Sequence, residues 1–301
     1  MQTLPFRVTC THIDGSFPNK NNCSLTVARF DQLHPFISGN KYFKLKYNLQ
    51  QVRDENKHGI LTMGGAYSNH LAATAFACHE QGITSVAIIR GEITEPLNPT
   101  LLFCTMHGMK LIPVRRSEYA LDNDVVMKIA ATYPHLLFVP EGGNNEAGLK
   151  GCKELLQPVE NVQQYSHIIC SIGTGTTFKG VAASASAGQT VIGIPALKIK
   201  EQDQAGFLLQ LINHDCKAKQ MILFGYAGKG YARYDELLIN FMNLFYTKTS
   251  IPTDIIYTGK LFQAVITLCN NDFFISNSKV LVIHSGGLQG NKSVTPGKLL
   301  F

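Results

Sequence analysis

The chain has 301 residues, of which 45% are hydrophobic and 16% are charged, a composition typical of a globular protein with a buried core. Its net charge of +6 comes from scattered lysines and arginines without a basic cluster, so we expect no nucleic-acid partner. The sequence has no apolar run of the roughly 18 residues that cross a membrane, and its first ten residues lack the apolar core of a signal peptide. We therefore predict a cytoplasmic protein without membrane association.

The eight cysteines lie far apart and form no C-x-x-C pair. This spacing argues against a zinc ribbon and against a thioredoxin-type motif. We expect reduced, mostly buried thiols and no metal site.

Short apolar runs that stop at glycine recur along the chain, and between several of them lie helical patterns. In chain order the runs are GILTMGGAY, SVAIIRG, LLFVPEGG, HIICSIGTG, VIGIPAL, MILFGYAG and VLVIHSGG. Apolar spacing predicts helices in 69–82, 146–159 and 236–248. Runs in which apolar and polar residues hardly alternate are typical of strands buried on both faces. The order strand, helix, strand predicts parallel sheets in an α/β fold. Ligands bind at the carboxyl ends of such strands, where the glycines stand.

The stretch SIGTGTTFKG (171–180) is the best candidate for an anion site. Gly173 and Gly175 lack side chains, so several backbone N–H groups can converge on one anion, and the following helix adds its positive end. The hydroxyls of Thr174, Thr176 and Thr177 add donors. We expect a single phosphate here; a plain strand-to-helix turn is the alternative.

Two nucleotide-binding motifs fail on single residues. Phe178 stands where G-x-G-x-x-G requires its third glycine, and Asn291 separates glycine from lysine in GGLQGNKS. No acidic residue closes a strand about twenty residues beyond the first loop, which argues against a Rossmann dehydrogenase.

The stretch GGAYSNHLAATA begins another helix, with Ser68 or Asn69 as a good N-cap. Its free N–H groups could hold a carboxylate, although capping alone also explains the residues. In SGNKYFKLKY, Asn40 can cap a helix and Lys41 falls in the first turn, where a cation opposes the helix dipole. A lysine, a phosphate site and a carboxylate site together indicate a pyridoxal phosphate enzyme that acts on amino acids.

These stretches resemble one family, the D-cysteine desulfhydrases and 1-aminocyclopropane-1-carboxylate (ACC) deaminases, which are fold-type II pyridoxal phosphate enzymes related to the tryptophan synthase β subunit. The resemblance runs from about residue 30 to about residue 290. Eight stretches follow the family order: SGNKYFKLKY, GGAYSNHLAATAF, PEGGNNEAGLKG, SIGTGTTFKG, IGIPALK, GYAR, IYTGK and IHSGGLQG.

The resemblance implies two α/β domains with open twisted parallel sheets, flanking helices and pyridoxal 5′-phosphate between them. The larger domain would comprise residues 1–43 and 151–301, and the smaller one residues 44–150. It also implies a homodimer.

By the same resemblance, Lys41 matches the lysine that forms a Schiff base with the cofactor and then moves the α-proton. Ser68 matches a serine beside the substrate carboxylate, and Asn69 an asparagine that bonds the cofactor's phenolic oxygen. His70 matches a substrate-side histidine of the desulfhydrases; packing in a helix is the alternative. Lys44 matches a second lysine near the site, or is a charge on the helix surface.

Residues 173–177 match the phosphate loop, and Tyr231 and Tyr257 match two active-site tyrosines. ACC deaminases have glutamate, which meets the pyridine nitrogen, where this chain has Thr258. At the position of Ser285 in this chain, ACC deaminases have leucine and desulfhydrases have threonine. A hydroxyl partner leaves the ring nitrogen neutral and the electron sink milder.

These two positions favour β-elimination from a substrate with a good leaving group. The resemblance therefore implies a D-cysteine desulfhydrase-like lyase that forms pyruvate, ammonia and sulfide. ACC deamination to 2-oxobutyrate and a non-catalytic pyridoxal phosphate-binding protein are the alternatives.

Overall fold

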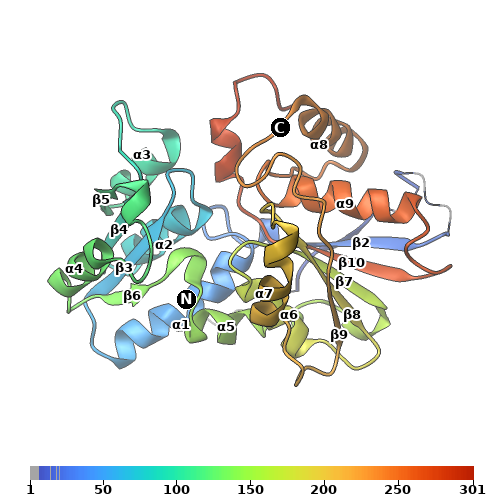
Figure 1. The fold of residues 1–301 in the computed structure, drawn as a ribbon, viewed down its shortest axis with the longest axis horizontal. Helices are drawn as coiled ribbons and strands as arrows, with labels where there is room; N and C mark the ends of the chain where they lie inside the picture. The colour runs from blue at the N-terminus through green and yellow to red at the C-terminus, as the bar shows by residue number, and fades with distance from the viewer. Residues whose placement is uncertain (1–6, 14, 18, 20) are drawn as a thin grey trace.

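Two separate sheets organise the chain, and the computed structural model describes them through residues 7–13, 15–17, 19 and 21–301 (Figure 1). The larger sheet has six strands in the order β1-β2-β10-β7-β8-β9, all parallel to their neighbours except β1, which is antiparallel to β2. Its strands are β1 (Cys10–His12), β2 (Ser24–Arg29), β7 (His167–Ile172), β8 (Thr190–Pro195), β9 (Lys219–Ile222) and β10 (Lys279–His284).

The smaller sheet, on the left in Figure 1, has four parallel strands in the order β5-β4-β3-β6. Its strands are β3 (Gly59–Gly64), β4 (Thr84–Arg90), β5 (Lys110–Val114) and β6 (Leu137–Val139). The helices that accompany the two sheets are α1 (Asn40–Asp54), α2 (Asn69–Glu80), α3 (Pro99–Met106), α4 (Asp124–Thr132), α5 (Glu146–Cys152), α6 (Thr176–Ser184), α7 (Glu201–Leu211), α8 (Glu236–Thr249) and α9 (Thr258–Asn270).

Burial on both faces explains why the strands read as continuous apolar runs. On β7, Ile168 and Ile169 are both fully buried but belong to two different apolar clusters, one on each face of the larger sheet. On β3, Ile60 and Leu61 likewise belong to different clusters. Neighbouring side chains of a strand point to opposite faces, so both faces must be apolar when helices cover both.

The prediction of an α/β fold with parallel sheets and flanking helices is confirmed. All seven predicted strands form. The helix predicted for 146–159 is shorter, because regular helix ends at Cys152 and turns follow. The runs that form β1, β2 and β5 were not predicted as strands. In the part of the chain that the structure describes, no helix is long and apolar enough to span a membrane.

Each sheet has one point where the strand order reverses. In the larger sheet the chain adds β8 and β9 on one side of β7 and then returns to place β10 on the other side. In the smaller sheet it adds β4 and β5 on one side of β3 and later places β6 on the other. The loops after two such strands diverge and leave a crevice, which is where open α/β sheets bind ligands.

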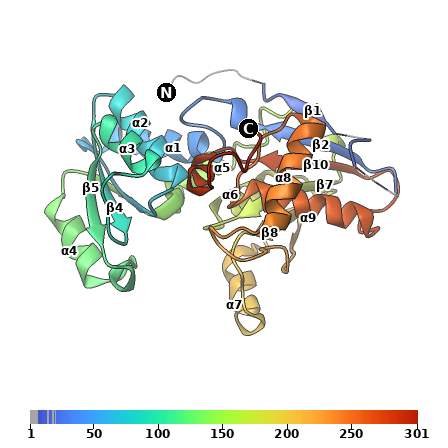
Figure 2. The same ribbon diagram turned by 90° about the horizontal axis from the view of Figure 1, so that it is seen from above.

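Helices α1, α5 and α6 pack together near the middle of the molecule, between the sheets (Figure 2). Two glycines permit the close approach, because a side chain at Gly151 would collide with the backbone of Phe43 on α1, and one at Gly180 would collide with Cys152 on α5. This packing connects the two sheets through helices and sets the first turn of α1 beside the start of α6.

Candidate active site

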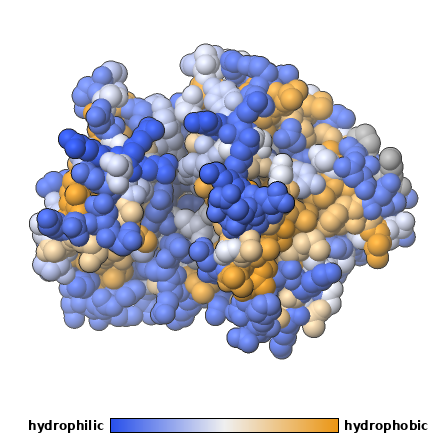
Figure 3. All heavy atoms as spheres, in the orientation of Figure 1, coloured by the Kyte–Doolittle hydropathy of each residue, from blue (hydrophilic) through white to orange (hydrophobic). Residues whose placement is uncertain are grey.

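A cavity with an empty volume of about 980 Å³ lies where the carboxyl ends of both sheets meet. Figure 3 shows a hollow between the two units, bordered mainly by hydrophilic residues. Eleven of the twelve predicted site residues line the cavity: Lys41, Ser68, Asn69, His70, Gly173, Thr174, Gly175, Thr177, Tyr231, Tyr257 and Ser285.

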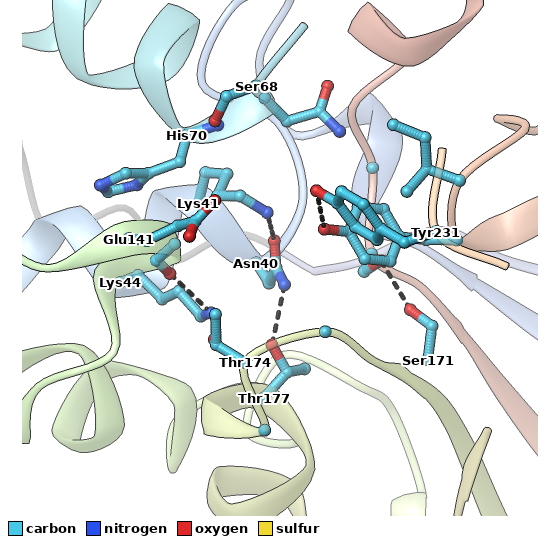
Figure 4. Close-up of a pocket in the computed structure, with 18 of the residues that line it drawn as sticks. Asn40, Lys41, Lys44, Ser68, His70, Glu141, Ser171, Thr174, Thr177 and Tyr231 are labelled. Atoms are coloured by element: carbon cyan, nitrogen blue, oxygen red, sulfur yellow. Dashed lines mark hydrogen bonds between the residues drawn. The ribbon is translucent and has the colours of Figure 1, made fainter. Parts of the chain in front are cut away.

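Lys41 stands in the first turn of α1, which begins at Asn40 after Gly39. The Lys41 Nζ donates to Asn40 Oδ1 at 2.6 Å, and Asn40 Nδ2 donates to Thr177 Oγ1 at 2.8 Å (Figure 4). Asn40 was predicted to cap the helix, but its amide instead links the lysine to the loop before α6. Burial, and after it the charge of Lys44, lowers the pKa of Lys41 to about 7. A large share of this amine is therefore uncharged and nucleophilic at neutral pH.

Lys44 is buried and lines the same cavity, one turn further along α1. Its Nζ donates to Gly142 O at 2.8 Å, and burial lowers its pKa. The alternative of a helix-surface charge is therefore wrong. Two amines on successive turns therefore reach the cavity, and both can donate hydrogen bonds to an anionic ligand.

The loop before α6 has the geometry of an anion site. Gly175 has φ +89°, a conformation that favours glycine, and Thr176 begins the nine-residue helix α6. A Cβ at Gly173 would lie 3.0 Å from the ring of Tyr257, so the absence of a side chain keeps the loop open against that ring. Backbone N–H groups and the positive helix end therefore face the cavity together with Thr174 and Thr177.

Thr176, the twelfth of these residues, does not line the cavity. Its hydroxyl donates to Asn144 Oδ1 at 2.7 Å and lies 3.2 Å from the hydroxyl of Thr174. The side chain thus connects the loop to residues that precede α5. Its backbone N–H remains part of the helix start.

Ser68 caps α2 as predicted, because its hydroxyl accepts from the backbone N–H groups of His70 and Leu71. Asn69 is the first residue of the helix. Its Oδ1 accepts from the backbone N–H of Gln289 at 3.0 Å, which leaves the Nδ2 of a cavity-lining amide available as a donor. The start of α2 therefore offers hydrogen-bond donors to a ligand from the side of the smaller sheet.

The tautomer of His70 follows from its partners. Thr62 Oγ1 donates its only proton to Val139 O at 2.7 Å, so the Nε2 of His70, 2.9 Å away, must donate to Thr62. His70 Nδ1 is then a bare acceptor, buried and without a hydrogen-bond partner among the described residues. Burial, with Lys41 and Lys44 as further causes, lowers the pKa of His70 to about 3, so the ring is neutral.

Tyr231 and Tyr257 meet in the cavity with their hydroxyl oxygens 3.2 Å apart (Figure 4). Burial is the main cause that raises the pKa of Tyr257 well above its usual value, and the neighbouring Tyr231 adds to it. Burial also raises the pKa of Tyr231. Both phenols keep their protons at neutral pH and can donate them.

Thr258 does not line the cavity described above. It is the first residue of α9, and its hydroxyl exchanges hydrogen bonds with the side chain and backbone of the fully buried Asp254 at 2.7 Å. The prediction that Thr258 meets the cofactor ring is therefore wrong, because this side chain is used to begin a helix. Two other hydroxyls line the cavity at the reversal point of the larger sheet, 3.5 Å apart: Ser171 is on β7, and Ser285 directly follows β10.

These residues fit pyridoxal 5′-phosphate. The donors of the loop before α6 suit a phosphate, the Lys41 amine suits an aldehyde, and the free amide donor of Asn69 suits a phenolic oxygen. The paired hydroxyls of Ser171 and Ser285 can meet a ring nitrogen without charging it.

Several further cavity residues were not predicted as members of the site, among them Asn40, Arg90, Glu141 and Ser171. Arg90 and Glu141 each stand next to the glycine that ends an apolar run, in the stretches IIRG and VPEGG. Their position at the carboxyl end of a parallel strand was the sequence signal that could have identified both as site residues. In the part of the chain that the structure describes, no cluster of side chains could hold a metal ion.

Comparison with known proteins agrees with this chemistry. A family model described as pyridoxal-phosphate dependent enzyme matches residues 16–286. A Thermotoga maritima protein, provisionally named a 1-aminocyclopropane-1-carboxylate deaminase, is 28% identical over 289 residues, which cover 90% of this chain and 91% of that protein. The bifunctional D-cysteine desulfhydrase/1-aminocyclopropane-1-carboxylate deaminase of Arabidopsis thaliana is 25% identical over 295 residues, or 90% of this chain and 74% of that protein.

The fold is also found in solved structures. The crystal structure of an ACC deaminase homologue superposes with a TM-score of 0.78 at 20% identity and covers 97% of this chain and 92% of its own. This likeness shows that the two chains share a fold.

Proposed function

Because the chain belongs to the pyridoxal-phosphate dependent enzymes, we propose that it catalyses β-elimination from a small amino acid, with D-cysteine as the substrate. The products would be pyruvate, ammonia and sulfide, formed with the net uptake of one water. Pyridoxal phosphate, the cofactor of this family, supplies the electron sink for the carbanion at Cα when it is bound. What this chain supplies is binding, orientation and proton transfer.

The substrate carboxylate would dock at the start of α2. The helix is twelve residues long, and Ser68 and the Asn69 amide stand at its positive end beside the cavity. A carboxylate there gains from the helix dipole and from the free donor of the Asn69 amide. This places the α-carbon between the smaller sheet and Lys41.

Lys41 would take the proton from Cα. Its pKa of about 7 matches a base that works near neutral pH, and the bond to Asn40 holds its amine beside the phosphate loop. Tyr257 would give a proton to the departing sulfur, since its raised pKa keeps it protonated and Tyr231 orients its hydroxyl.

The observation that carries the choice of substrate is the pair of neutral hydroxyls of Ser171 and Ser285 at the end of the larger sheet. A carboxylate there would hold the pyridine nitrogen protonated, whereas hydroxyls leave the electron sink weaker. A weaker sink suffices when the β-substituent leaves easily, as a thiol does. Opening an unactivated cyclopropane demands more of it.

Keto-acid release tests the proposal. The protein loaded with pyridoxal phosphate is given D-cysteine, L-cysteine or ACC separately, and pyruvate, 2-oxobutyrate and sulfide are measured. We expect pyruvate and sulfide from D-cysteine. Release of 2-oxobutyrate from ACC, without sulfide from either cysteine, would replace this proposal by the deaminase that several relatives' names suggest.

A pyridoxal phosphate-binding protein without turnover is the third outcome of the same assay. It would show the cofactor spectrum and release no keto acid from any of the three substrates. A homodimer and a cytoplasmic location also stay predictions; light scattering of the loaded protein checks the first.

A further inference from the structure

Arg90 is a cavity residue that the mechanism above does not use. It is the last residue of β4, paired in register with Val114 of β5, and its side chain reaches the cavity from the carboxyl end of the smaller sheet. A Cβ at Gly65 would lie 3.5 Å from a guanidinium nitrogen, so the group lies against the loop that leads to Ser68.

The guanidinium packs against two aromatic rings. Its central carbon lies 5.7 Å from the centroid of the Tyr119 ring and 5.9 Å from that of Tyr231. Such contacts attract the cation without using its N–H donors. Among the residues that the structure describes, no hydrogen bond or ion pair uses those donors.

The position of Arg90 relative to the two tyrosines determines which part of a substrate its guanidinium could reach. In the proposed mechanism Lys41 marks the α-carbon and Tyr257 the leaving group, and Tyr231 contacts both Tyr257 and Arg90. A substituent that extends from Cβ past the two phenols would therefore meet the guanidinium. The thiol of cysteine ends before that point.

We propose that Arg90 binds an anionic group at the far end of the substrate's side chain. The substrate class would then be amino acids whose β-substituent ends in a carboxylate or another oxyanion, such as cysteine with a carboxylate-bearing group on sulfur. A planar guanidinium with free N–H groups matches a carboxylate through two parallel hydrogen bonds. The inference rests on the proposed function and specifies its substrate.

Glu141 lies in the same part of the cavity, and its charge also affects the binding of an anionic side chain. Burial raises the pKa of Glu141, and the charge of Arg90 acts in the opposite direction. The two side chains do not form an ion pair in the described structure. An anionic side chain on Arg90 would be repelled by an ionised Glu141, so removing that charge should strengthen its binding.

Binding of glutamate and glutamine tests the proposal, because they have nearly the same shape and differ in side-chain charge. Neither has a leaving group on Cβ, so binding is read from the absorbance of the bound cofactor. With the D and L forms of each, we expect the wild type to bind glutamate about 10- to 100-fold more tightly than glutamine in at least one enantiomeric series.

Two variants and a matched control complete the design. Arg90→Met should remove the preference for glutamate and leave glutamine binding unchanged, while Glu141→Gln should increase glutamate affinity. Arg116→Met is the control, since Arg116 is exposed, approaches the backbone at Gly91 next to Arg90 and does not line the cavity. It should keep the preference.

Turnover extends the test. S-carboxymethylcysteine should release pyruvate with a higher kcat/KM than its amide, S-carbamoylmethylcysteine, and Arg90→Met should erase the difference.

Several results would overturn the inference. Equal wild-type affinity for glutamate and glutamine would do so, and so would an equal loss of both in Arg90→Met, which would place Arg90 on the α-carboxylate. If neither binds while D-cysteine still releases pyruvate, the subsite is wrong and the proposed function stands. If nothing is turned over but glutamate binds through Arg90, the proposed function fails and the subsite stands.

Discussion

The two walls of the cavity present different chemistry. The wall from the larger sheet consists of backbone N–H groups and neutral hydroxyls, including Thr174, Thr177, Ser171 and Ser285. The wall from the smaller sheet carries ionisable side chains, namely His70, Arg90 and Glu141, beside the start of α2. Lys41 lies on α1, between the two walls (Figure 4).

This difference suggests a division of labour. Neutral donors around a helix start bind a phosphate and leave the electronic properties of a ring largely unchanged, which suits a cofactor. Charged side chains at strand ends discriminate between ligands, because an unmatched charge is costly in a cavity. We therefore expect changes in the first wall to affect cofactor binding and changes in the second to affect substrate choice.

The largest effect should follow from changing the residue between the walls. Lys41→Ala removes the amine that we propose to bond the cofactor and to act as the base, so keto-acid release should fall by at least about 10²- to 10⁴-fold. The absorbance of the lysine-bound cofactor should disappear as well. Lys46→Ala is the control on the same helix, because Lys46 pairs with Glu154 outside the cavity. Normal absorbance and turnover in Lys41→Ala would refute the assignment.

A tenfold or larger effect is expected on the cofactor wall. Valine is nearly the same size as threonine, so Thr177→Val removes only a buried hydroxyl and leaves the Asn40 amide without its acceptor. Pyridoxal phosphate affinity, measured by titration of the protein without cofactor, should fall about 10- to 100-fold. Thr176→Val is the matched control, since that hydroxyl faces Asn144, and it should change the affinity less than about threefold. Equal losses in both variants would contradict the division between the walls.

The lowered pKa of Lys41 predicts a pH dependence. Only the uncharged amine attacks the cofactor aldehyde, and its fraction rises as pH increases through about 7 and then levels off. Cofactor capture by the cofactor-free protein should therefore slow by about tenfold for each pH unit below 7 and change little from pH 8 to 9. Free lysine is the reference, because its capture rate keeps rising toward pH 10. A protein rate that also keeps rising would show that burial does not lower this pKa.

Much of the cofactor wall could be predicted from sequence, because it depends on local chemistry. Gly173 and Gly175 after a buried strand predict an open loop before α6. These features need only a few neighbouring residues. Their roles toward a ligand, and the division of the chain after residues 43 and 150, stay predictions.

The substrate wall could not be predicted as well, because it depends on side-chain direction and on distant partners. Arg90 and Glu141 are single charges at strand ends, and a single charge has no periodicity to detect. On the cofactor side, Thr258 was misplaced although its partner is local, because its side chain turns toward Asp254, four residues earlier. Strand β2 was missed because its partner β10 lies some 250 residues further along the chain.

The smallest effect is expected from Lys260, which connects the two walls indirectly. Its buried Nζ donates to Gly230 O, directly before Tyr231, and burial lowers its pKa to about 8 while Asp254 and Asp235 oppose the change. The bond fixes the loop that presents Tyr231 to the cavity. Lys260 is thus a positioning residue without contact to the cavity.

Lys260→Met should leave the cofactor affinity unchanged and lower kcat by about threefold to tenfold, because Tyr231 and Tyr257 would then lose their fixed distance. Lys260→Arg, which keeps a donor, should recover part of the rate. A purely structural role would lower the melting temperature and the amount of active protein without changing kcat per bound cofactor. Measuring kcat, KM and cofactor occupancy together distinguishes the positioning role from the structural one. A loss of occupancy alone would show that Lys260 supports cofactor binding.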